Sequence, residues 1–224
     1  AGSLVHAGEM FTSGLEVPAN VPIAAGSAGY DGQFYYRLAL DPFLEQVSLG
    51  PRLDRPAYRH QRILYPLLAR AVALGRWEHI PVAMMLVNLV SLAALGGLGA
   101  YLAMSLGRSA NWGFVFALYP GFGFSVLHDL PEPVAAVFLL GGIVALRARR
   151  YGAASVFYSL GVLTRETVLV VVLGVLAAWA WSAWRGRSSS REAGRSGGEW
   201  IAGAVPVVLF LVWQAYVTLR WGHP

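Results

Sequence analysis

Long apolar runs, separated by short clusters of charge, set the fold class of this chain before any other feature. The runs lie at 80–106, 112–127, 131–146, 153–184 and 201–219, and charges at 165 and 166 interrupt the fourth. A helix needs about 20 apolar residues to cross a bilayer of roughly 30 Å. The pattern predicts an all-α, polytopic transmembrane helix bundle of about five spans, in which 153–184 forms a broken pair.

The composition agrees with a membrane protein. The chain is 56% hydrophobic and only 13% charged, whereas soluble domains carry about 25% charged residues. All 17 basic residues are arginines, and they lie beside apolar runs rather than on one basic face. We therefore attribute the net charge of +5 to membrane topology and expect no nucleic-acid partner. The absence of cysteine excludes disulfides and thiolate metal sites.

Two regions differ in character. Residues 1–62 are polar and rich in glycine and proline, which indicates an extracytoplasmic loop, and 63–224 make up the bundle. The segment 63–75 is too short to cross and predicts a re-entrant or interfacial helix. Because the chain begins at Ala1 inside polar sequence, we expect it to be a fragment that lacks an N-terminal span.

Arginine placement predicts which side of the membrane each turn faces. Arginines follow three runs, at 108, 147–150 and within the Ser/Gly/Arg linker 185–198, which assigns these three loops to the cytoplasm. Residues 1–79 and the turns 128–132 and 164–166 then share the outer side. Five arginines between 37 and 62 oppose this rule, and an anionic ligand is one reason for them.

Two constellations lie in the first region. Gly29–Arg37 places glycines on both sides of Tyr30-Asp31, which permits backbone angles that present the carboxylate, and its aromatic rings could stack on a sugar. The alternative is an amphipathic interfacial segment with an aromatic belt. Arg52–Arg62 suits a phosphate or pyrophosphate, because arginine forks bind phosphate bidentately. Its alternative is attraction to anionic lipid headgroups.

Two further constellations lie between apolar runs. Asp129 and Glu132 are three residues apart and could share a face if the turn is helical, but an ordinary polar turn is the favoured interpretation. Arg165 and Glu166 form a charged pair between two apolar runs. Charges at such depth mark function, unless the pair is a self-neutralising structural one.

The strings GYDGQFYYRLALDPF, RPAYRHQRILYPLLAR, ALYPGFGFSVLHDLPEPVA and LTRETVL, in order between about Gly29 and Leu169, resemble the GT-C glycosyltransferase superfamily. The similarity is to bacterial, mannosyltransferase-related enzymes that use polyprenyl-phosphate sugars. It implies sugar transfer at the outer leaflet of the inner (cytoplasmic) membrane. The expected partners are a polyprenyl-phosphate sugar donor, a glycan or lipid acceptor, and membrane lipids.

The resemblance also implies residue roles. Asp31 matches the position of a catalytic base, Arg55, Arg59 and Arg62 would face the donor phosphate, and the later motifs would line the same cavity. The candidate catalytic residues are Asp31 and Glu166. The candidate substrate-binding residues are Gln33, Tyr35, Tyr36, Arg55, Tyr58, Arg59, Arg62, Asp129, Glu132 and Arg165. No cofactor is expected, and the first region lacks the adjacent pair of acids that would support a divalent metal.

Two other functions fit the same residues. A transporter or flippase for a lipid-linked anion would use the same arginines and broken helices, but it should show pseudo-symmetry between halves of the chain. A non-catalytic subunit of an envelope complex would tolerate loss of Asp31.

Overall fold

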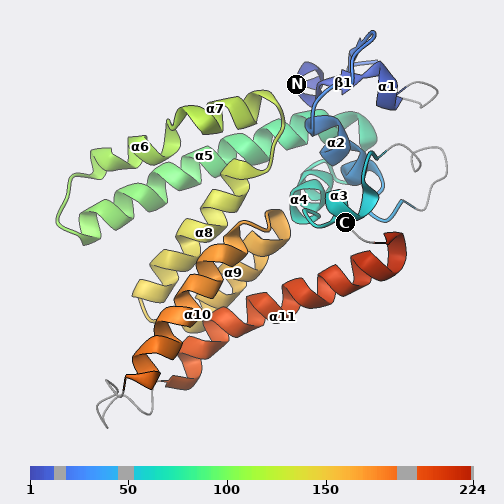
Figure 1. Ribbon diagram of the computed structural model, residues 1–224. Coiled ribbons are helices and arrows are strands. Elements are labelled where there is room, and N and C mark those ends of the chain that lie inside the picture. Colours follow the sequence, from blue (N-terminus) through green and yellow to red (C-terminus); the bar gives the residue numbers. More distant parts are fainter. Residues whose placement is uncertain (13–18, 45–52, 186–195, 223–224) are drawn as a thin grey trace.

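The computed structural model describes residues 1–12, 19–44, 53–185 and 196–222, and these residues are almost entirely helical (Figure 1). They form eleven α-helices, a few 3₁₀ turns and one minimal sheet, in which β1 (Ala7–Gly8) pairs in parallel with β2 (Ile23–Ala24). The predicted all-α class is confirmed.

Short helices gather at one end of the molecule, where both ends of the described chain also lie (Figure 1). They are α1 (Glu9–Thr12), α2 (Gly32–Leu40), α3 (Pro56–His60) and α4 (Leu64–Val72), with a 3₁₀ turn at Gly2–Val5. The last carbonyls of α2 have no partner within the helix, and Arg70 of α4 donates to those of Ala39 (3.0 Å) and Leu40. The short segments are thus tied to one another by side chains as well as by packing.

α5 (Ile80–Ser105) is the long helix predicted at 80–106, and a 3₁₀ turn at Trp77–His79 precedes it. The run 112–127 folds back along α5 as a 3₁₀ turn (Ala110–Trp112) and two short helices, α6 (Gly113–Ala117) and α7 (Pro120–Leu127). The break falls before Pro120, because proline lacks an N–H and holds the preceding residue in an extended conformation. α6 approaches α5 closely through Gly113, which packs against the carbonyl oxygen of Gly96.

The remaining runs form α8 (Glu132–Arg147), α9 (Tyr151–Thr164), α10 (Val168–Trp184) and α11 (Ser196–Trp221). The break predicted within 153–184 is present, because Arg165 leaves the helical conformation. Glycines again allow close packing, since Gly141 and Gly142 of α8 face the rings of Phe157 and Tyr158 on α9. α9 lies between α8 and α11.

Two helical segments of the described chain, Trp77–Ser105 and Gly198–Trp221, are long and apolar enough to cross a membrane. The helices of the other predicted spans are shorter, and α10 is the longest of them at 17 residues. Large apolar side chains are exposed along both candidate spans, for example Val90 on α5 and Val212 on α11. These outward faces, together with length and composition, indicate membrane association.

The first region does not fold separately from the bundle. Tyr35 and Tyr36 of α2 belong to the same buried cluster as Tyr65 of α4, Met84 of α5 and Val134 of α8. The segment expected as an extracytoplasmic loop is therefore a folded cap on one end of the helices.

Candidate functional site

Asp31 lies at the N-terminus of α2, and the two flanking glycines allow its position. Gly29 has φ +70°, and a Cβ there would lie 2.4 Å from the carbonyl oxygen of His6. A Cβ on Gly32 would lie 2.4 Å from the carbonyl oxygen of His128, in the turn before α8. Gly29 thus has an unusual backbone angle of the kind that the sequence pattern predicted, whereas Gly32 allows a close approach of two backbone segments that the pattern did not predict. The Asp31 side chain remains 40% exposed.

Arg59 of α3 joins Asp31 to a second carboxylate. Its Nη1 lies 2.9 Å from Asp31 Oδ2, while its Nε and Nη2 each donate to Asp54 at 2.9 Å. The guanidinium also lies over the ring of Phe34, 4.2 Å from its centroid. The hydrogen bonds from Arg59 lower the pKa of Asp54 despite its partial burial. Arg59 is therefore held on three sides and keeps Asp31 in one place.

Arg62, one helical turn later, connects the first region to the α9–α10 turn. Its Nε and Nη2 donate to Glu166 at 2.9 and 2.5 Å, and the same guanidinium donates to the hydroxyls of Tyr35 (3.2 Å) and Tyr58 (2.6 Å). Burial is the largest influence and by itself would raise the pKa of Glu166. The hydrogen bonds from Arg62, a backbone hydrogen bond and the positive charges of Arg62 and Arg165 together outweigh it, so the pKa is lowered. Glu166 is thus a firmly held partner of Arg62 with a low proton affinity.

The α7–α8 turn and the α9–α10 turn meet through an ion pair between Glu132 and Arg165. Both side chains are about one quarter exposed, with values of 28% and 27%. Two turns that are more than 30 residues apart in sequence therefore face each other at the same end of the bundle as Asp31.

Asp129 differs from the other acids because it is fully buried. Its backbone has φ +48°, it packs beside Gly32, and neither carboxylate oxygen has a hydrogen-bond partner among the described residues. Burial raises the pKa of Asp129 to about 7. The carboxyl group of Asp129, a predicted substrate-binding residue, is thus enclosed by protein atoms.

Three residues of α2 that are predicted to bind substrate are also buried. Gln33, Tyr35 and Tyr36 are 1–3% exposed, so their side chains do not present faces to a sugar. Gln33 holds the chain before α2 instead, because it accepts from the N–H of Gly8 (3.1 Å) and donates to the carbonyl of Ala28 (2.7 Å). The aromatic residue of this motif that does reach the surface is Tyr30, which is 42% exposed.

Among the predicted arginines, Arg55 is the exposed one. It directly precedes α3, and its guanidinium makes no ion pair with any residue that the structure describes. Arg59 and Arg62 are instead occupied by carboxylates, so their charges are neutralised within the protein. Arg52, which opens the same sequence motif, lies outside the described residues.

Two partners of the site are missing from the predicted set. Asp54 pairs with Arg59. The spacing of five residues indicates such a pair only weakly, because the backbone between them is not helical before α3 begins. The C-terminal helix is the second. Trp213 donates to the carbonyl of His60 at 2.9 Å, and Trp221 stacks on the imidazole of His60 at 3.7 Å. No local pattern relates α11 to α3.

The site is therefore a set of ion pairs at one end of the bundle, in which three arginines neutralise four carboxylates beside an exposed fourth arginine. In the described ranges, no group of three or more His, Asp or Glu side chains is placed to hold a metal ion. Comparisons with models of protein families, with curated proteins and with solved structures find no match to this chain. The function has to be argued from the site itself.

Proposed function

We propose that this protein is a multi-pass membrane glycosyltransferase that moves a sugar from a polyprenyl-phosphate donor to a cell-envelope acceptor. The observation that carries the proposal is the half-exposed Asp31, which Arg59 fixes inside a cluster built from four segments far apart in sequence. Placing so many charged side chains next to apolar helices costs free energy, and charged clusters of this kind are typically functional.

Placement in the membrane follows from the exposed apolar faces and from the arginines. α5 and α8 both run from the charged site to the end that carries Arg108 and the arginines at 147–150. The positive-inside rule assigns that end to the cytoplasm and the site to the extracytoplasmic face of a bacterial inner membrane. The short helices α6, α7, α9 and α10 would complete the bundle as broken or paired spans.

The chemistry assigned to the site is transfer with inversion at the sugar carbon. The acceptor hydroxyl oxygen forms a bond to C1 of the sugar, the bond from C1 to the phosphate oxygen breaks, and its electron pair leaves on polyprenyl phosphate. Asp31 takes the proton of the acceptor hydroxyl, and the exposed guanidinium of Arg55 faces the departing phosphate. Both groups lie at the surface of the same end of the molecule.

The paired residues have a positioning role in this proposal. Arg59 fixes the carboxylate of Asp31, and the Arg62–Glu166 pair ties α3 to the α9–α10 turn. Glu166 is a candidate catalytic residue by sequence, but its bonds to Arg62 and its lowered pKa favour positioning over proton transfer. Glu132, Arg165 and Tyr58 are partly exposed, so they remain the candidates to line the acceptor side.

The test is transfer of radiolabelled sugar from polyprenyl-phosphate donors, in membranes that contain the full-length protein. Asp31→Asn removes the base and keeps the shape, so transfer should fall by at least about 100-fold while donor binding persists. Glu78→Gln is the matched control, because Glu78 is an exposed acid on the same end, outside the cluster. Its activity should equal that of the wild type.

Other outcomes distinguish the rivals. Equal transfer by Asp31→Asn and the wild type would refute Asp31 as the base. If the wild type transfers no sugar from any donor, the glycosyltransferase proposal fails. Movement of a lipid-linked anion across vesicles in that case would identify a transporter or flippase instead.

A further inference from the structure

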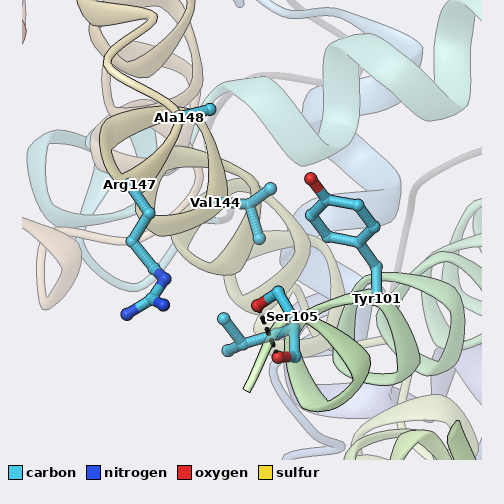
Figure 2. Close-up of a pocket in the computed structure, with 6 residues that line it drawn as sticks. Tyr101, Ser105, Val144, Arg147 and Ala148 are labelled. Carbon is cyan, nitrogen blue, oxygen red and sulfur yellow. Dashed lines mark hydrogen bonds between the residues drawn. The ribbon is translucent and has the colours of Figure 1, made fainter. Parts of the chain in front are cut away.

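A polar pocket lies at the opposite end of the helices, away from the charged site. It has a volume of about 330 Å³ and is lined by the C-terminal ends of α5 and α8: Tyr101, Leu102, Ser105, Val144, Arg147 and Ala148. Figure 2 shows Tyr101 and Ser105 on one side and Val144 and Arg147 on the other. The lining therefore combines apolar walls with one guanidinium and two hydroxyls.

The polar groups of this pocket are available to a ligand. The Ser105 hydroxyl donates to the carbonyl of Leu102 at 2.7 Å, which leaves its oxygen free to accept a further hydrogen bond (Figure 2). Tyr101 is 54% exposed, and Arg147 makes no ion pair with a described residue. Two hydroxyls and a cation around one cavity match the oxygens of a phosphate group.

The two helices that line the pocket carry only positive charge near it. The turn after α5 carries Arg108, and Arg149 and Arg150 follow Arg147. No acidic residue occurs between Glu78 and Asp129, or between Glu132 and Glu166, in the sequence. Both helices therefore deliver only positive charge at this end, so an anion is favoured over a neutral or cationic ligand.

The apolar walls decide which kind of anion fits. Leu102 and Val144 line the cavity, and the neighbouring Met104 and Leu106 are 55% and 56% exposed, so apolar surface continues outward from it. A soluble phosphate would leave this surface in water, whereas a phospholipid covers it with its acyl chains. Tyr101, which lines the pocket, adds an aromatic ring of the kind that membrane proteins place at the level of lipid headgroups.

The geometry points to a binding site for an anionic phospholipid, whose phosphate contacts Arg147, Tyr101 and Ser105 and whose chains lie along α5 and α8. The site depends on the proposed orientation of the protein in a membrane, but not on sugar transfer. It would hold the arginine-rich ends of the two helices at the cytoplasmic headgroups.

The test measures lipid retention by the full-length protein in detergent micelles, using native mass spectrometry with phosphatidylglycerol or phosphatidylcholine as the probe. We expect one phosphatidylglycerol to be retained in preference to phosphatidylcholine, and Arg147→Gln to weaken that retention about fivefold. Arg108→Gln is the matched control, because it removes the same charge from the same end without touching the pocket. Because Arg108 contributes only to the general positive charge of this end, Arg108→Gln should weaken the retention of phosphatidylglycerol clearly less than Arg147→Gln does.

Three results would overturn the inference. They are the absence of a preference for phosphatidylglycerol, an equal loss in the Arg147→Gln and Arg108→Gln variants, and displacement of the lipid by millimolar inorganic phosphate. The last result would identify a site for a free anion. Since the readout is lipid retention, failure here leaves the transfer assay with Asp31→Asn unaffected, and the reverse also holds.

Discussion

Arg62 offers the sharpest test of what holds the site together. Its guanidinium is only 6% exposed and donates to Glu166 and to two tyrosine hydroxyls, so it joins α3 to a turn 104 residues away. Arg62→Gln removes the cation and leaves the Glu166 carboxylate, 28% exposed, without its partner.

The magnitude follows from the burial of the two groups. Removing one partner of a buried ion pair costs about 3–5 kcal/mol, because the remaining charge is desolvated and uncompensated. Glu166 keeps some contact with solvent, which reduces the penalty, so we expect Arg62→Gln to lower the free energy of unfolding by about 3 kcal/mol. In a double-mutant cycle with Glu166→Gln, the coupling energy should be about 2 kcal/mol.

The same site provides an internal control. The Glu132–Arg165 pair also joins two distant segments, but both of its side chains are more than a quarter exposed. Solvent screens such a pair, so the cycle of Glu132→Gln and Arg165→Gln should give a coupling of at most about 1 kcal/mol. Burial, rather than the mere presence of opposite charges, is thus the variable under test.

The assay is equilibrium unfolding of the full-length protein in detergent micelles at pH 7, followed by circular dichroism for wild type, single and double variants of both pairs. At this pH the Glu166 contribution is fully present. It is lost only as the pH falls through the lowered pKa of Glu166. Equal coupling energies for the two pairs, or a coupling below about 0.5 kcal/mol for Arg62 and Glu166, would refute the reasoning.

Three further predictions concern the residues around the site. Burial raises the pKa of Asp129 from 3.8 to about 7, so wild-type stability should fall as the pH rises between these values. Asp129→Asn should remove this pH dependence. Relative to the wild type, its free energy of unfolding should rise by up to about 4 kcal/mol as the pH rises through this range, as measured by unfolding at a series of pH values. Gly32→Ala should lower the free energy of unfolding by about 1–3 kcal/mol, because the new Cβ would lie 2.4 Å from a backbone carbonyl oxygen. Gly97→Ala is the control, since its Cβ would meet nothing within 4 Å, and thermal unfolding of both variants should show it to be neutral or stabilising. Trp213→Phe removes the hydrogen bond to the carbonyl of His60, so the free energy of unfolding should fall by about 1 kcal/mol and amide hydrogen exchange in α3 should become faster. Unchanged exchange would show that α11 does not stabilise α3.

Much of the fold could be predicted from local sequence because apolar runs and helix breakers act locally. The run at 80–106 forms one helix, and the break at Pro120 follows from a missing N–H. The interruption at Arg165 likewise appears where the sequence places charge between apolar runs. The number of membrane crossings could not be predicted in the same way. Several of these helices are shorter than the thickness of a bilayer, so whether they cross depends on what packs beside them.

For the site, local sequence was enough to predict which segments carry charge and where glycines permit unusual backbone angles. The positive φ of Gly29 is an angle that glycine adopts readily, whereas the close approach of Gly32 to the carbonyl of His128 depends on two segments that are far apart in sequence. The ion-pair partners likewise became clear only from the fold. Arg59 binds Asp54 and Asp31, Arg62 binds Glu166, and Asp129 is left buried without a partner. Ion pairs depend on distances in space and on desolvation, and neither is encoded in the spacing of residues along a chain.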